Sequence, residues 1–203
     1  MKRVGLVLVV IALALTGCGS KKPTAATTPT PSATAGATTS ASPSGSPTPS
    51  GSPADLFEFS VDGAGPYKLG MTLTALQASP GLTSVGPATT CPGNTVAHGK
   101  GTWGDVELDF HNDGKLYLAV NKSISVPTPS GVYLGASLAD LKRIYVGVGG
   151  QQLTHGPDSA FLVVTLSGGG ILFVLDPTQR VTSMVAGDST LLRSSFTGGT
   201  SYC

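Results

Sequence analysis

The stretch LGMTLTAL at residues 69–76 has a close counterpart further along the chain, LGASLADL at residues 134–141. In each stretch a hydroxyl side chain, Thr72 or Ser137, stands where a helix N-cap is expected, because its oxygen can accept a hydrogen bond from the first helical turn. The two leucines that follow, at positions i and i+3, share one helix face. Each stretch therefore predicts a short helix that buries one side.

Leu69 and Leu134 are separated by 65 residues, a distance that we name the repeat offset. Positions outside these two helices also match at this offset. Ten positions are identical when the chain is compared with itself at this offset. The identical pairs are Ser60/Ser125, Val61/Val126, Leu69/Leu134, Gly70/Gly135, Leu73/Leu138, Leu76/Leu141, Thr89/Thr154, Pro92/Pro157, Gly104/Gly169 and Val120/Val185. We interpret them as two tandem units, at about 56–120 and 121–185, with a C-terminal tail at 186–203.

Around each helix the sequence indicates strands joined by short turns. Alternating apolar residues predict an opening strand near Phe57, Phe59 and Val61, and another near Ile124 and Val126. After the helices, strands are expected at 95–100, 106–110 and 116–120, and at 161–166, 171–175 and 181–185. The turn at 112–114 (Asn-Asp-Gly) favours a tight hairpin. The predicted fold class is α+β, two units of short helix plus antiparallel meander.

This pattern resembles known families. A Gly-Met-Thr start to a short helix, at 70–72, followed by a meander and given twice, resembles the tandem repeat of the β-lactamase inhibitory proteins. The single unit is similar to the SmpA/OmlA-type lipoproteins of outer-membrane assembly. The stretch GPYKLGM at 65–71 looks most like two-repeat lipoproteins of high-GC bacteria. The resemblance implies a tandem α+β fold and carries over no functional residues.

The N-terminal segment at 1–18 has the organisation of an export signal. Lys2 and Arg3 precede an apolar run at 4–15, and small residues lead to Cys18. A plain transmembrane helix is the alternative, but about 20 apolar residues are needed to span a bilayer. The ending Leu-Thr-Gly-Cys resembles a bacterial lipobox, which implies cleavage before Cys18 and diacylglycerol on its sulfur. The membrane is then a partner through the lipid on Cys18.

The segment at 19–53 is composed almost wholly of Ser, Thr, Pro, Ala and Gly. Such a segment cannot bury enough apolar area to offset the entropy of ordering it. We therefore expect a disordered tether between the lipid and a folded domain at 54–203.

The charge of that domain differs from the charge of the whole chain. Four of the twelve basic residues, Lys2, Arg3, Lys21 and Lys22, precede residue 54, whereas all eleven acidic residues follow it. Eight bases and eleven acids give the domain a formal charge of −3. A mildly acidic domain without a basic stripe argues against nucleic acid as a partner.

The other two cysteines, Cys91 and Cys203, are expected to form a disulfide outside the membrane, where thiols oxidise. A redox pair or a reactive thiol is the alternative, although no Cys-x-x-Cys is present. The three histidines lack the mutual spacing of zinc motifs. We expect no metal and no cofactor.

One cluster could carry chemistry. Strand alternation would put Glu107, Asp109, His111 and Asp113 on one face, where they could bind a metal or transfer a proton. The alternative, which we favour, is a solvated strand face that leads into the turn at 113–114. No Gly-x-Ser-x-Gly motif and no phosphate-binding Gly loop is present.

The aromatic residues give weaker indications. We expect Trp103 to pack at the edge of the core rather than to act as a binding anchor. Tyr67 and Tyr133 both precede a predicted helix, which suggests that each packs at a helix start.

Together these features predict a lipoprotein at the extracytoplasmic face of the cell membrane. It would display a non-catalytic domain that binds a protein or another envelope component. The alternatives are an extracellular hydrolase or metal-dependent enzyme with a dispersed site, and a secreted-type enzyme inhibitor.

Overall fold

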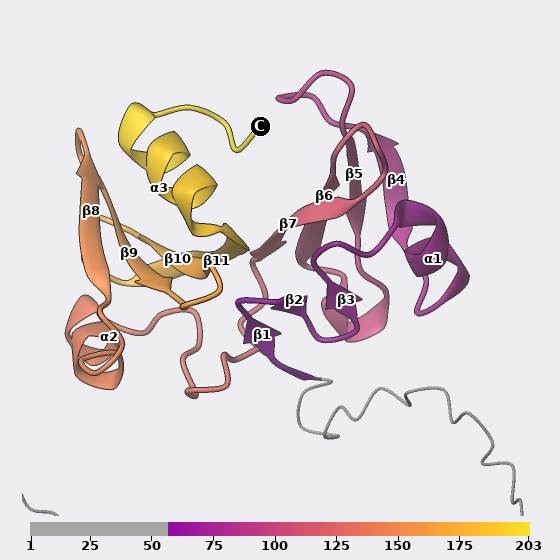
Figure 1. Cartoon of the computed structure of the whole chain (residues 1–203). Coiled ribbons are helices and arrows are strands. Elements are labelled where there is room, and N and C mark those ends of the chain that lie inside the picture. Colours follow the sequence, from indigo (N-terminus) through magenta and orange to yellow (C-terminus); the bar gives the residue numbers. More distant parts are fainter. Residues whose placement is uncertain (1–56) are drawn as a thin grey trace, which may run out of the picture. The chain divides into compact units, whose positions relative to one another are not determined.

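The computed structural model of the chain describes residues 57–203 (Figure 1). The signal at 1–18 with Cys18, the tether at 19–53 and the start of the predicted domain at 54–56 lie outside the described residues.

The described part is built on one antiparallel sheet of eight strands, in the order β4-β5-β6-β7-β11-β10-β9-β8. Its strands are β4 (Thr83–Pro87), β5 (Thr95–His98), β6 (Val106–Phe110), β7 (Leu116–Asn121), β8 (Gln151–His155), β9 (Asp158–Val164), β10 (Gly169–Leu175) and β11 (Val181–Asp188). We name residues 57–121 the first half and residues 122–203 the second half. The halves meet where β7 pairs with β11, and there Val120 lies opposite Val185, its counterpart at the repeat offset.

Three helices and a small sheet complete the fold. The helices are α1 (Leu73–Ala78), α2 (Leu138–Ile144) and α3 (Ser189–Gly198), with a 3₁₀ turn, η2, at Gly101–Trp103. Three short strands, β1 (Phe59–Ser60), β2 (Gly63–Ala64) and β3 (Tyr67–Lys68), form the small antiparallel sheet. The fold is therefore mixed, with antiparallel β structure in the majority.

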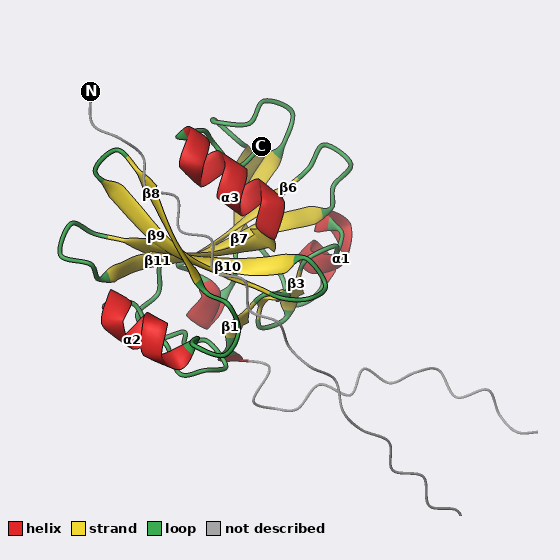
Figure 2. Ribbon diagram, turned by 60° about the vertical axis from the view of Figure 1, so that its left-hand side comes forward, coloured by secondary structure: helices red, strands yellow, loops and turns green. Residues whose placement is uncertain are grey.

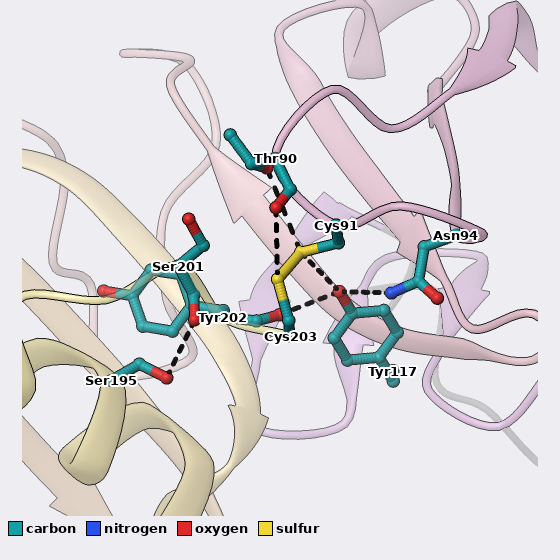
Figure 3. Close-up of a disulfide and its surroundings, with 8 residues drawn as sticks. All are labelled: Thr90, Cys91, Asn94, Tyr117, Ser195, Ser201, Tyr202 and Cys203. Carbon is teal, nitrogen blue, oxygen red and sulfur yellow. Dashed lines mark hydrogen bonds between the residues drawn. A yellow bond between two sulfur atoms is a disulfide. The ribbon is translucent and has the colours of Figure 1, made fainter.

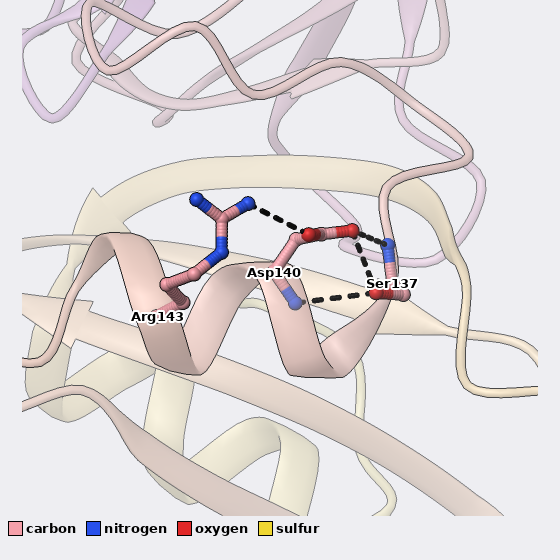
Figure 4. A network of polar contacts seen from close by, with 3 residues as sticks. All are labelled: Ser137, Asp140 and Arg143. Atoms are coloured by element: carbon pink, nitrogen blue, oxygen red, sulfur yellow. Dashed lines mark hydrogen bonds and ion pairs between the residues drawn. The ribbon is translucent and has the colours of Figure 1, made fainter.

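The predicted N-caps of α1 and α2 are confirmed. The Thr72 hydroxyl accepts a hydrogen bond from the Ala75 N–H, and the Ser137 hydroxyl accepts one from the Asp140 N–H. In α2 the cap is reciprocal, because the Asp140 carboxylate also accepts from the Ser137 N–H (Figure 4). The Arg143 guanidinium donates to Asp140 at 2.8 Å, and with Ser137 it lowers the pKa of Asp140 to about 2.

The two faces of the sheet carry separate hydrophobic clusters. One cluster lies between the sheet and α1, α2 and the small sheet, and its members include Leu76, Leu108, Leu141 and Phe173. The other lies between the sheet and α3, and includes Leu118, Leu162 and Leu192. Figure 2 shows α3 on one side of the sheet and α2 on the other.

The same backbone hydrogen bonds recur at the repeat offset. In each half, three of them join the segment at the start of the helix to the hairpin between the last two strands, and the fourth lies within that hairpin. The donor and acceptor pairs are Gly70/Leu116 and Gly135/Val181, Leu73/Gly114 and Leu138/Gln179, Leu116/Met71 and Val181/Ala136, and His111/Lys115 and Asp176/Arg180. Each half thus holds its helix against its hairpin in the same way.

Several elements differ from the sequence prediction. Among the described residues no strand forms near Ile124 and Val126, because the Asn121 side chain holds this segment in a turn by donating to the Val126 carbonyl and accepting from the Ser123 N–H. The strands β4 and β8 were not predicted; both lie at sheet edges and lack a clear apolar alternation. The predicted tail at 186–203 contains α3, which begins after an Asp188 cap and ends at Gly199.

Candidate functional site

The halves differ in the space between the end of the helix, α1 or α2, and the loop that follows β5 or β9. In the first half, Tyr67 and Trp103 fill this place; both are buried, with ring centroids 6.2 Å apart and edge-on. The Tyr67 hydroxyl donates to the Gly81 carbonyl at 3.0 Å and accepts from the Lys100 N–H at 2.8 Å. A Cβ at Gly99 would lie 2.5 Å from the Trp103 Cβ, so glycine is required there. The two rings form a plug, and the expected burial of Trp103 is confirmed.

In the second half, at residues 122–203, the counterpart of the plug is missing. At the repeat offset, Trp103 corresponds to Gly168 and Tyr67 corresponds to Val132. An apolar cleft of about 920 Å³ opens at this place. We name it the apolar cleft; it is lined by Ser60, Val61, Pro129, Ser130, Ile144, Tyr145, Gly147, Val148, Val163, Val164, Thr165, Leu166, Ser167 and Ile171.

The apolar cleft has a buried floor and an exposed apolar rim. Val163 and Ile171 are buried at the floor, whereas Val148 is 56% exposed and Leu166 is fully exposed. Concave, mostly apolar surfaces of this kind are typical of binding sites. The rim therefore marks the cleft as a candidate binding surface.

Several polar groups that line the apolar cleft form hydrogen bonds with neighbouring groups. The Thr165 and Ser167 hydroxyls lie 2.9 Å apart, and the Thr165 hydroxyl also donates to the Gly169 carbonyl. Tyr145 is the single titratable side chain among the lining residues that the structure describes, and its hydroxyl lies 3.3 Å from the Thr128 hydroxyl. The cleft can offer apolar contact, and its described side chains do not converge on a reacting group.

The predicted chemical cluster lies on the other face of the sheet, in the first half. Glu107 pairs with Lys122 at 3.2 Å. Asp109 is half-buried, and burial, followed by the Glu107 charge, raises its pKa to about 6 against the opposing effect of Lys122. The expectation of a solvated strand face is thus wrong at Asp109. A small recess of about 320 Å³ contains both carboxylates together with Tyr117 and Tyr202.

His111 and Asp113 follow the end of β6. The His111 ring stacks on Tyr117 with centroids 3.8 Å apart. Asp113 lies in the turn, where it accepts from the Lys115 N–H at 3.0 Å and pairs with the Lys115 ammonium at 3.8 Å. The structure therefore does not bring the four residues together on one strand face. Within residues 57–203, no three His, Cys, Asp or Glu side chains form a group that could hold a metal ion.

The C-terminal segment closes one side of this recess. A disulfide joins Cys91, in the loop after β4, to Cys203 (Figure 3). The Tyr117 hydroxyl donates to the Tyr202 carbonyl at 2.8 Å, and the Asn94 amide donates to the Tyr117 hydroxyl at 3.3 Å. The disulfide therefore links the C-terminal tail of the second half covalently to the first half. This agrees with the bridge that the sequence predicts between these cysteines.

Sequence reasoning missed the apolar cleft. It also expected Tyr133 to pack at a helix start like Tyr67, and this is wrong because Tyr133 is 48% exposed. The comparison at the repeat offset contained the missing signal, since it places Gly168 opposite Trp103. The cleft is thus associated with the lack, in the second half, of a ring that corresponds to Trp103.

No helix within residues 57–203 combines the length and the apolar character that crossing a membrane requires.

Comparisons with known proteins give partial likenesses. No protein-family model and no curated protein matches the chain. An extracellular protein containing a SCP domain from Bacillus anthracis str. Ames is 18% identical, with a TM-score of 0.43. The match covers 62% of this chain and 46% of that protein, so this chain spans less than two thirds of its length. The uncharacterized protein yfeY from Escherichia coli is 15% identical over 64% of this chain and 99% of its own, with a TM-score of 0.42. These likenesses assign neither a family nor a function.

Proposed function

We propose that the chain is a lipid-anchored protein of the cell envelope whose folded domain binds a partner protein through the apolar cleft, without catalysis. The anchor is the lipid on Cys18, at the extracytoplasmic face of the cell membrane. The observation that carries the binding role is the cleft itself, with the exposed Val148 and Leu166 at its rim.

The size and lining of the cleft support binding. Ligand sites in proteins are typically concave, mostly apolar and on the order of 300–1,000 Å³. The apolar cleft has about 920 Å³ and a single titratable lining residue among those described, Tyr145. A catalytic site would need a general acid, base or nucleophile aimed at a reacting atom. The recess beside Asp109, whose pKa is raised to about 6, is the feature in favour of the alternative of a dispersed enzyme site, but at about 320 Å³ it is much smaller than the apolar cleft.

We infer that the two halves are tandem copies of one unit, at about 56–120 and 121–185. The recurrence of the same backbone hydrogen bonds at the repeat offset supports this, as does the Val120–Val185 pair at the junction. Duplication accounts for the binding site in simple terms. One copy keeps its plug and supplies stability, while the other, without the plug, is free to bind.

Anchoring is tested by Cys18→Ala in the native host. The variant should lose lipid modification and leave the membrane fraction or stay uncleaved, whereas Ser20→Ala, close by in the sequence, should fractionate like the wild type. A Cys18→Ala protein that is cleaved and still sediments with membranes would show that the anchor is elsewhere.

Binding through the apolar cleft is tested by site-specific crosslinking in intact cells. A photoreactive residue at Leu166 should give a discrete adduct, and the same residue at Ile124 should not, although Ile124 is 76% exposed. Gly147→Trp should abolish the Leu166 adduct, because Gly147 lines the cleft and an indole there would occupy it. Equal adducts from both positions would contradict a binding role for the cleft.

A further inference from the structure

The first half shows what fits into the place that is empty in the second. Its plug is held between the segment after α1, which includes Gly81, and the loop after β5, which includes Gly99 and Lys100. The corresponding positions at the repeat offset are 146 and 164–165. Positions 164 and 165 line the apolar cleft, and position 146 lies between Tyr145 and Gly147, which both line it. The cleft is therefore the vacant counterpart of a seat that holds two aromatic rings.

On this basis, and resting on the proposed function, we infer that the apolar cleft receives an aromatic side chain, an indole above all, from a partner protein. The seat in the first half takes Trp103 edge-on against Tyr67, with the tryptophan provided by a short turn, η2. A partner that presents a tryptophan on an exposed turn would reproduce this arrangement from outside.

The walls of the cleft suit such a ring. Val148, Val163 and Ile171 provide aliphatic surface, and Tyr145 provides an aromatic ring. Tyr145 already packs 5.6 Å from Phe173 and 6.4 Å from Phe161, between ring centroids. An entering ring would extend this aromatic group, and aromatic side chains in such pockets are the usual anchors of protein interfaces.

Charge separates this occupant from others. Among the described lining residues, none is Asp, Glu, Lys, Arg or His. A charged group entering the cleft would lose its hydration without compensation, which is costly. An acyl chain would also make apolar contacts with the walls of the cleft. In the first half, however, the corresponding place is occupied by flat aromatic rings, which are the observed precedent.

The test uses the chain from residue 19 onward, which includes every residue that the structure describes and keeps the segment at 19–53. N-acetyl-tryptophanamide is titrated into the ¹⁵N-labelled protein up to roughly 10 mM, since a single ring gives only weak binding. Saturable shifts at Val148, Val163 and Leu166 are expected, with N-acetyl-leucinamide at least about fivefold weaker.

Gly147→Trp should remove these shifts, because a Cβ at Gly147 meets open space and its indole can turn into the cleft. Gly86→Trp is the matched control, because Gly86 also has open space and does not line the cleft. It should bind N-acetyl-tryptophanamide as the wild type does.

Three outcomes would overturn the inference: shifts of equal size with the leucine amide, shifts with sodium octanoate but not with the tryptophan amide, or no saturable shift with any probe. The crosslinking experiment keeps the two proposals apart. If the Leu166 adduct persists in any of these cases, the binding role stands and only the aromatic occupant is wrong. If the adduct is absent although the indole binds, the binding role in cells is wrong.

Discussion

The two halves of the sheet have the same backbone connections and leave opposite faces open. The inner face of the sheet is the one that α1 and α2 cover, and the outer face is the one that α3 packs on. In the first half, Tyr67 and Trp103 close the inner face, while the outer face carries the half-buried Asp109 and meets α3 through residues of β7 such as Leu118. In the second half, α3 covers the outer face, and the inner face opens into the apolar cleft. A single scaffold can thus be a stable support on one side and an open surface on the other, through the choice of a few residues.

The largest effect is expected from emptying the first half. Trp103→Ala should lower the free energy of unfolding by about 3–5 kcal/mol, because it leaves a cavity under the sheet where the plug was. Urea denaturation of the wild type and the variant measures the difference. Tyr133→Ala is the control; this tyrosine is 48% exposed and should cost less than about 1 kcal/mol. Similar losses from both variants would contradict the contrast between a filled and an open half.

The next largest effect concerns the bond between the halves. Replacing both Cys91 and Cys203 by serine should lower the free energy of unfolding by about 2–4 kcal/mol, because the bridge closes a long loop in the unfolded chain. The fold should persist, since both hydrophobic clusters are unaffected. Mass spectrometry of the unreduced wild type is the companion measurement, and two free thiols per chain would refute the bridge.

Asp109 tests the open outer face of the first half. Its pKa is raised from 3.8 to about 6, so the folded protein binds this proton more tightly than the unfolded chain does. Stability therefore falls as the pH rises from about 4 to about 6 and does not recover above it. Asp109→Asn should be more stable than the wild type at pH 7–8 by on the order of 1–2 kcal/mol, and equally stable below about pH 4.

Thermal unfolding between pH 3 and pH 8 measures this effect. Asp62→Asn, at an exposed position in the first half, should show no such pH-dependent gain in stability. A gain for Asp109→Asn that is the same at every pH would mean that the carboxylate is not the cause.

The smallest effect compares the two helix caps. Ser137→Ala should cost about 1 kcal/mol, and Thr72→Ala somewhat less. The reason is that Ser137 and Asp140 cap each other, whereas the position equivalent to Asp140 in the first helix is Ala75, which cannot return a hydrogen bond. Urea denaturation of the two variants measures both costs, and a larger cost for Thr72→Ala would contradict this ranking.

Local features of the fold could be predicted from the sequence. The helices begin where Thr72 and Ser137 indicated, and β6 has the predicted bounds. These features depend on neighbouring residues: a hydroxyl that caps a turn, and apolar side chains that alternate along a strand. The end of α3 was also readable in principle, from Gly199 in the left-handed conformation that closes a helix.

Features that depend on distant parts of the chain could not be predicted in this way. The pairing of β7 with β11 joins strands that are far apart in the sequence, and no local pattern encodes it. The half-burial of Asp109 depends on Tyr202 and the C-terminal tail, which lie beside it only in the folded protein. The apolar cleft depends on the absence of rings that correspond to Trp103 and Tyr67, and only a comparison of the two halves indicates that absence.

The disulfide has a mechanical consequence. It turns residues 91–203 into a closed covalent ring that contains β5 to β11 and both later helices. A pull on the chain ahead of residue 57 can extend only residues 57–90 before it reaches this ring. That part includes the small sheet, α1 and the edge strand β4, whereas most of the residues that line the apolar cleft lie inside the ring. A force applied to the chain ahead of residue 57 would therefore not extend it beyond Cys91, and the second half would stay within the covalent ring under load.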